Sequence, residues 1–144
     1  MEQAKQLLCS YLRVTQHMSR QFRSYFSRLD RTFPQALVLT VLGEEGAMPI
    51  SRLARQTGSA NSTVSGIVDR LEKLKLVERV RSDEDRRVIY VALTESYRAM
   101  QGEMEPSVSE YLAKLLKELS VGEMTEICAA LDKLDTALQR AERK

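Results

Sequence analysis

Residues that mark metal sites, disulfide frameworks and membrane spans are scarce in this sequence. It has no tryptophan, one histidine, two cysteines and three prolines among 144 residues. The two cysteines, Cys9 and Cys128, cannot build a disulfide framework, and a lone histidine without a CxxC pair excludes a His/Cys metal site of ordinary spacing. No apolar run approaches the roughly 18 residues that a membrane-spanning helix needs. Because the N-terminus also lacks the basic and apolar segments of a secretory signal, we expect a cytoplasmic protein.

Motifs of nucleotide-binding proteins and hydrolases are missing as well. The patterns GxGxxG, GxxxxGK[ST] and GxSxG do not occur. Carboxylates cluster at Glu44, Glu45 and residues 83–85, but no His, Lys or Cys partner lies near them in sequence for acid–base chemistry. We therefore expect a protein that is not an enzyme and that needs no cofactor and no metal.

The charge is unevenly distributed, although the net charge is only +2. Residues 1–32 carry six basic and two acidic side chains, and residues 49–94 carry nine basic and six acidic ones. Residues 95–144 carry seven basic and ten acidic side chains. The near-neutral total therefore conceals a basic first part and middle and an acidic tail, so the chain can still present a basic face to nucleic acid.

The apolar pattern predicts that most of the chain is helical. Spacings of three and four between apolar residues indicate a long helix over residues 1–32. Cap and stop signals indicate a buried helix from Thr32 to Gly46 and two more helices over residues 51–58 and 61–74. Ser51 is the expected cap of the third of these helices.

Two strands and further helices follow. In residues 77–82 Val77, Arg79 and Arg81 alternate with Glu78, Val80 and Ser82, and residues 88–93 are mostly β-branched or aromatic, which predicts a β-hairpin with a charged tip. Thr94 can cap the next helix, which we expect to kink or break near Glu105 because Pro106 follows. A capping box at residues 120–123 starts the last helix. The expected fold class is mainly α with a small β-hairpin wing.

Two short helices, a tight turn and a hairpin follow one another within residues 49–94, in the order of a winged helix-turn-helix. The second helix begins with short side chains that let its backbone approach base edges and phosphates, and an arginine follows one turn later. These residues are Asn61, Ser62, Thr63, Ser65, Gly66 and Arg70. The hairpin tip carries Arg86 and Arg87, and a narrow minor groove attracts arginine. We therefore predict double-stranded DNA as the partner.

A simpler explanation of each feature stays open. Ser, Thr and Asn at a helix start often only cap the helix, and a charged hairpin tip is often only a solvated turn. Asp83 and Glu84 at this tip would also repel phosphate. The alternative function is a winged-helix protein-interaction module without sequence-specific DNA readout.

At these residues the sequence resembles the MarR family of bacterial transcriptional regulators. The wing signature D-x-R-x-x-x-x-x-L-T of that family matches residues 85–94, and residues 62–65, 68–72 and 76–79 resemble its recognition helix and first wing strand. The resemblance implies a homodimer that binds a pseudo-palindromic operator, with repression as the expected role. Residues 33–94 would then bind DNA.

The resemblance also implies a role for individual residues and for the two ends of the chain. Residues 1–32 and 95–144 would form the dimerisation region. Ser62, Thr63 and Ser65 would face the major groove. Arg87 would enter the minor groove, restrained by a salt bridge to Asp85, and Arg86 would lie near the backbone. Many family members have Ser where this chain has Ala60. Because alanine cannot cap a helix, we expect either that Ser59 or Asn61 caps the recognition helix or that the helix starts one position away.

Family members often respond to small aromatic ligands, and some respond to oxidants through a cysteine. Cys9 lies where oxidant-sensing relatives carry theirs, and Lys5 and Arg13 are each four residues away, which is close on a helix. His17 is a candidate ligand contact. The alternatives are that Cys9 is a small apolar residue and that His17 is a partly buried polar residue of the fold.

Overall fold

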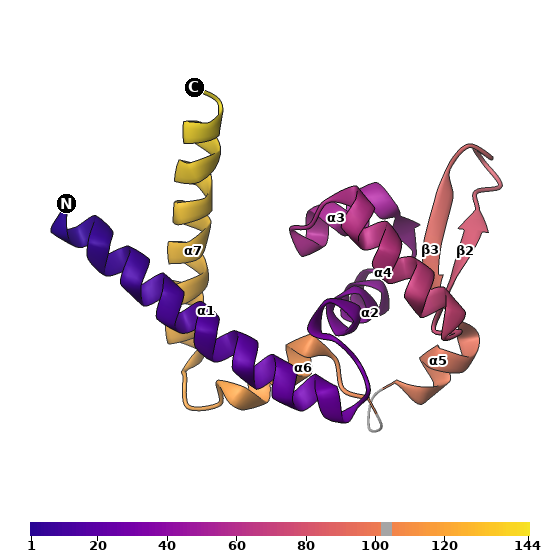
Figure 1. The fold of residues 1–144 in the computed structure, drawn as a ribbon, viewed down its shortest axis with the longest axis horizontal. Helices are drawn as coiled ribbons and strands as arrows, with labels where there is room; N and C mark the ends of the chain where they lie inside the picture. Colours follow the sequence, from indigo (N-terminus) through magenta and orange to yellow (C-terminus); the bar gives the residue numbers. More distant parts are fainter. Residues whose placement is uncertain (102–104) are drawn as a thin grey trace. The chain divides into compact units, whose positions relative to one another are not determined.

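The computed structural model describes residues 1–101 and 105–144 as seven helices and three strands (Figure 1). In chain order these are α1 (Glu2–Arg28), α2 (Phe33–Glu45), β1 (Met48–Pro49), α3 (Ile50–Thr57), α4 (Asn61–Lys73), β2 (Val77–Arg81), β3 (Ile89–Leu93), α5 (Glu95–Met100), α6 (Val108–Leu115) and α7 (Val121–Glu142). They form two compact units, Met1–Ser109 and Glu110–Lys144. The predicted mainly α fold with a hairpin wing is confirmed. No helix of the described residues is long and apolar enough to cross a membrane.

Helix α2 lies at the centre of the first unit. Its predicted cap is present, because the Thr32 hydroxyl accepts the Gln35 backbone N–H at 3.2 Å and the Gln35 side chain accepts the Thr32 N–H at 3.1 Å. Its C-cap is Gly46, which has a φ of +88°, a backbone conformation that residues with a side chain rarely adopt. Its buried residues are Ala36, Val38, Leu39, Thr40, Val41 and Leu42. A helix that is apolar nearly all round is therefore the core helix, as predicted.

The sheet contains one strand that the sequence pattern did not predict. The strand order is β1-β3-β2, and β3 pairs antiparallel with both neighbours. The short strand β1 places Met48 opposite Val91, and both side chains are fully buried. Figure 1 shows the β2–β3 hairpin extending beyond α3 and α4 as the wing. Strand β3 begins at Ile89, one residue later than expected.

The start of α3 differs from the prediction. This helix begins at Ile50, and its N-cap is Pro49, with no side-chain cap hydrogen bond among the described residues. The predicted cap, Ser51, is wrong because it already lies inside the helix. Pro49 ends β1 with φ −66° and ψ 155°, so the chain passes directly from the strand into the helix. The predicted stop is confirmed, because Gly58 adopts the left-handed conformation at φ +66°.

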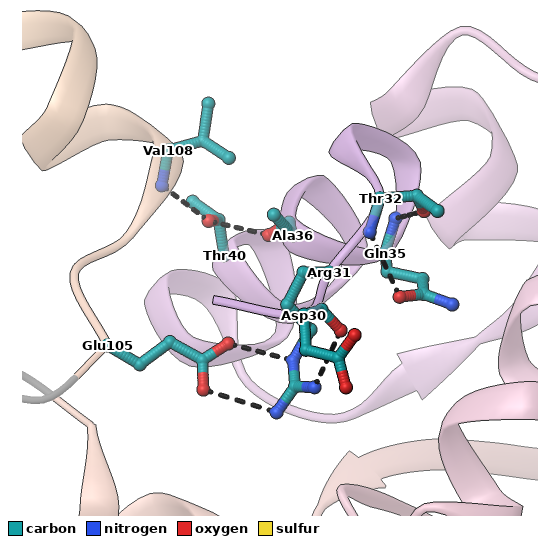
Figure 2. A network of polar contacts seen from close by, with 8 residues as sticks. All are labelled: Asp30, Arg31, Thr32, Gln35, Ala36, Thr40, Glu105 and Val108. Atoms are coloured by element: carbon teal, nitrogen blue, oxygen red, sulfur yellow. Dashed lines mark hydrogen bonds and ion pairs between the residues drawn. The ribbon is translucent and has the colours of Figure 1, made fainter. Parts of the chain in front are cut away.

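Within the first unit, a polar junction holds the segment before α6 against the end of α1 and against α2 (Figure 2). The Arg31 guanidinium donates two hydrogen bonds to Glu105, at 2.9 and 3.4 Å, and the two side chains are only 13% and 10% exposed. The buried Thr40 hydroxyl accepts the Val108 N–H, the first of α6, at 2.9 Å. Burial, followed by the charge and hydrogen bond of Glu105, raises the pKa of Tyr97 above its usual value. Glu105 therefore links the end of α1 to α5.

The predicted helix break is present. Helix α5 starts after Thr94, whose hydroxyl accepts the Tyr97 N–H at 3.2 Å, and it ends at Met100, earlier than expected. The next helix begins at Val108. Residues 102–104, which fall within the expected continuation of α5, lie outside the described residues.

The second unit exposes its apolar residues. The capping box of α7 is confirmed, with Ser120 accepting the Glu123 N–H at 3.1 Å. None of the residues of α7 is buried. Its exposed large apolar residues are Val121, Ile127, Leu131 and Leu138. A helix in water is stabilised mainly by burying an apolar face. The second unit supplies no surface that covers the exposed apolar residues of α7.

The end of α4 generates a stability prediction. Lys75 adopts a φ of +63°, and the turn is closed by hydrogen bonds from the Lys75 N–H to the Glu72 carbonyl and from the Leu76 N–H to the Leu71 carbonyl, both at 3.0 Å. A side chain in this conformation costs about 1 kcal/mol, which glycine avoids. We expect Lys75→Gly to raise the free energy of unfolding by up to about 1 kcal/mol in urea titrations at fixed protein concentration.

A matched substitution inside the same helix separates this effect from a general effect of glycine. Lys73→Gly should lower the free energy of unfolding by up to about 1 kcal/mol, because Lys73 has helical backbone geometry. A Lys75→Gly variant no more stable than the parent chain would show that the left-handed residue carries no strain.

Candidate nucleic-acid interface

Helix α4 has one buried and one exposed face. Val64, Val68 and Leu71 are 0% exposed and join the core of α2, α3 and the sheet. The residues on the other side are polar or small. Of these, Ser65 is half-buried, and the exposed ones are Asn61, Ser62, Thr63, Gly66, Asp69 and Arg70. The apolar stripe therefore holds the helix on the core and leaves its polar face free for a partner.

The first turn of α4 is open. Its N-cap is Ala60, and no side chain of the described residues caps it. The prediction that Ser59 or Asn61 would serve as the cap is therefore wrong. The Ser59 hydroxyl instead donates to the Thr57 carbonyl at 3.5 Å, because Ser59 follows the left-handed turn that ends α3. The first N–H groups of a helix carry partial positive charge, so an uncapped start is a ready site for an anion such as phosphate.

Gly66 lies in the middle of α4 with empty space beside it. Apart from its chain neighbours and the adjoining backbone of α4, no described residue places an atom within 4 Å of the Cβ that a larger residue would carry here, and its φ is not positive. Glycine inside a helix costs roughly 0.5–1 kcal/mol relative to alanine. Neither packing nor backbone conformation within the chain accounts for glycine at this position. A smooth helix surface is what close approach of an external partner would need.

The wing tip holds Arg87 against Asp85. The Arg87 guanidinium donates to both carboxylate oxygens of Asp85, at 3.1 and 3.2 Å, and the Arg87 N–H donates to the same carboxylate at 3.1 Å. These hydrogen bonds lower the pKa of Asp85 below its usual value. The Arg87 side chain is still 91% exposed. Arg81 donates to the Arg86 carbonyl, which orders the turn further.

An ion-pair cluster between α4 and β2 was not predicted. Arg79 donates to Asp69 at 2.7 Å and to Glu72 at 2.9 Å. Burial acts to lower the pKa of Arg79, but the hydrogen bonds and charges of Asp69 and Glu72 raise it above its usual value. The available signal was the spacing of two carboxylates three residues apart on the polar face of a helix. The sequence pattern gives no indication of which strand residue they meet.

The candidate sensing residues lie on α1. Both cysteines are exposed, and Arg13, which we expected beside Cys9, donates to the Ser10 hydroxyl at 3.2 Å. His17 is also exposed, with its Nδ1 atom 3.2 Å from Arg20. The role of Cys9 in oxidant sensing and that of His17 in ligand contact stay predictions.

A cavity of about 920 Å³ lies between α1, the start of α2 and α4. Phe22 and Phe33 stack in its wall with ring centroids 4.6 Å apart. Arg23 and Arg70 also line the cavity, so the same helix that carries the polar face contributes to its wall. A volume of this size, with aromatic rings and a few charged groups, is typical of small-molecule sites.

Comparison with known proteins relates these features to one family. The model of the MarR family matches residues 32–89. The uncharacterized HTH-type transcriptional regulator YfiV of Bacillus subtilis is 33% identical over 121 residues, which cover 84% of this chain and 76% of YfiV. The HTH-type transcriptional regulator MgrA of Staphylococcus aureus is 28% identical over 142 residues, which cover 97% of this chain and 95% of MgrA.

A solved structure shares the fold over almost the whole chain. Reduced AbfR bound to DNA, a Staphylococcus epidermidis protein, matches with a TM-score of 0.74 at 22% identity, covering 98% of this chain and 95% of AbfR. The residues that match the family model contain α2, α3, α4 and the wing loop. Together with the identity to YfiV over most of the sequence, this shows that the chain belongs to the MarR family.

Proposed function

We propose that the chain is a sequence-specific transcriptional repressor that binds a pseudo-palindromic operator as a homodimer. The relatives YfiV and MgrA are named as transcriptional regulators, and AbfR has been solved on DNA. In this proposal residues 33–94 bind DNA, and residues 1–32 and 95–144 dimerise. Catalysis plays no part in it.

The strongest support is the exposed face of α4, where an uncapped helix start and Gly66 leave the backbone open. An α-helix fits the major groove of B-DNA, and small side chains bring its backbone close to base edges. We place Asn61, Ser62, Thr63 and Ser65 there, with Arg70 able to reach a phosphate or a guanine.

The wing supports a second contact. Its tip carries Arg86 and Arg87, and the bidentate hydrogen bonds to Asp85 restrain the exposed Arg87 guanidinium. Restraint before binding reduces the entropy that Arg87 loses on entering a narrow minor groove. We therefore assign Arg87 to the minor groove and Arg86 to the neighbouring backbone.

Exposed apolar residues support the homodimer. Helix α1 exposes six large apolar side chains although it buries Phe22 and Phe26, and α7 buries none. The six are Leu7, Leu8, Tyr11, Leu12, Val14 and Met18. A second copy can cover such surfaces, and two copies of α4 roughly 34–36 Å apart would match successive major grooves.

The cavity supports release by a small aromatic ligand. Phe22 and Phe33 offer ring faces, and Arg23 and Arg70 outnumber Asp30 among its charged residues, with Arg31 already paired with Glu105. This set favours an aromatic anion. Because Arg70 is also assigned to DNA, a ligand bound here would act directly on the recognition helix. Release by oxidation of the exposed Cys9 is the other candidate mechanism.

Selection of bound sequences from a random DNA pool tests this function. The proposal expects an inverted repeat whose affinity exceeds that of a shuffled duplex and falls steeply with salt, because phosphate contacts release counterions. Equal affinity for selected and shuffled DNA would instead favour a protein-interaction module.

Gly66→Ala should change stability and DNA affinity in opposite directions. The added methyl group meets empty space, so the free energy of unfolding should rise by roughly 0.5–1 kcal/mol. The same methyl group would separate α4 from the groove floor and weaken operator binding about tenfold or more. Fluorescence anisotropy with the selected operator measures the affinity.

Gly122→Ala is the matched control, since Gly122 lies in α7 and an added Cβ would only reach ordinary contact, 3.8 Å from the Ser120 hydroxyl. It should leave DNA affinity unchanged. A Gly66→Ala variant with undiminished operator affinity would remove α4 from the interface.

Leu131→Glu should prevent dimer formation. A carboxylate in the middle of an apolar dimer interface would be left unpaired and poorly hydrated. Sedimentation velocity should then show monomers or unfolded chains, and operator affinity should fall with the loss of the second half-site contact. Lys133→Glu, on the opposite side of α7, should leave the dimer intact. A Leu131→Glu variant that stays dimeric would exclude this face of α7 from the interface.

Benzoate, a small aromatic carboxylate, should bind in the cavity and weaken operator binding, whereas neutral benzamide should do so less because the arginines prefer an anion. Phe33→Leu removes one ring of the stacked pair and should reduce benzoate affinity severalfold in ligand-observed NMR while sparing DNA binding. Unchanged benzoate binding by this variant would place the ligand elsewhere.

A further inference from the structure

Among the described strand residues, only Arg79 forms ion pairs with α4, the proposed recognition helix. Its two terminal nitrogens donate to different carboxylates, Nη2 to Asp69 at 2.7 Å and Nη1 to Glu72 at 2.9 Å. The Arg79 backbone N–H also donates to Glu72, at 3.3 Å. The Arg79 side chain is 24% exposed, so the cluster lies at the surface between α4 and β2.

This cluster joins α4, to which DNA contacts have been assigned, to β2, the strand that leads to the wing tip. Helix α4 carries the polar face, and β2 leads into the wing loop with Arg86 and Arg87. Leu71 of α4 and Val77 of β2 also belong to one buried apolar cluster. Apolar packing is non-directional, whereas a planar guanidinium between two carboxylates has a fixed geometry.

We propose that Asp69, Glu72 and Arg79 form a clamp that sets the position of the wing relative to α4, so that both elements meet one DNA duplex together. The proposal rests on the DNA-binding function above. The three side chains are positioning residues, because their polar atoms are directed at one another. The clamp raises DNA affinity although two of its three charges are negative.

The sign of the charge makes this claim testable. A carboxylate near DNA repels phosphate, so its removal ordinarily strengthens binding. Asp69 is 60% exposed on the polar face of α4, and simple electrostatics therefore predicts tighter DNA binding for Asp69→Asn. The clamp predicts the opposite, because the wing would lose its fixed position.

The experiment compares operator affinities of Asp69→Asn and Asp83→Asn by fluorescence anisotropy at one salt concentration. Asp83 is exposed at the wing tip outside the clamp, so its substitution is the matched loss of one negative charge. We expect Asp83→Asn to strengthen binding and Asp69→Asn to weaken it roughly tenfold, within the range of one lost arginine contact. Glu72→Gln should weaken binding in the same direction.

A double-mutant cycle with Arg87→Ala shows whether Asp69→Asn changes DNA affinity through the wing. If the clamp acts through the wing, Asp69→Asn should cost little further affinity once Arg87 is absent. Thermal unfolding of each variant confirms that the protein is folded at the assay temperature, so a loss of affinity is not a loss of fold. Arg79→Lys, which keeps the charge but not the two-armed geometry, should weaken binding as well.

Three outcomes would overturn the clamp. Asp69→Asn could strengthen binding as Asp83→Asn does, its effect could add fully to that of Arg87→Ala, or Arg79→Lys could bind as tightly as the parent chain. In each case the parent chain would still select its operator, so the proposed function would stand. A parent chain without DNA binding would instead overturn both.

Discussion

Burial of one face of α4 is the constraint on which the other features depend. Val64, Val68 and Leu71 are fully enclosed by the core, and this fixes the rotation of the helix about its own axis. The polar residues between them have to face outwards, whatever their function. Rotation by one residue would bury serine or aspartate without partners, at a cost of several kcal/mol. The hydrophobic core therefore determines which side chains a nucleic acid can meet.

Polar contacts at the edge of this core fix how neighbouring elements are oriented. Arg79 ties α4 to β2, and the nearly buried Arg31–Glu105 pair ties the end of α1 to the segment before α6. Thr40, inside the most apolar helix, holds the first N–H of α6. Breaking a buried ion pair by removing one partner is costly, roughly 3–5 kcal/mol, so the Arg31 pair resists separation of its two segments. Surface ion pairs contribute far less to the free energy of unfolding. The proposed role of Arg79 is therefore to position the wing relative to α4, and not to stabilise the fold.

Local pattern accounts for the parts of the fold that the sequence predicted. The stripe of α4, the capping boxes at Thr32 and Ser120, and the left-handed Gly58 each depend on residues within one or two turns. Strand β1 was missed because it is two residues long, ends in proline and exists only through its pairing with β3. The cap expected at Ser51 failed for the same reason, since β1 determines where α3 starts. The partner of Asp69 and Glu72 depends on a tertiary contact, which no short spacing encodes.

Methylation interference tests most directly whether α4 and the wing read one duplex in different grooves. Dimethyl sulfate modifies guanine N7, which faces the major groove, and adenine N3, which faces the minor groove. The account predicts that guanine methylation blocks binding within both half-sites and that adenine methylation blocks it beside them. In Arg87→Ala only the adenine pattern should disappear. An adenine pattern that survives in Arg87→Ala, or guanine methylation without effect, would contradict the account.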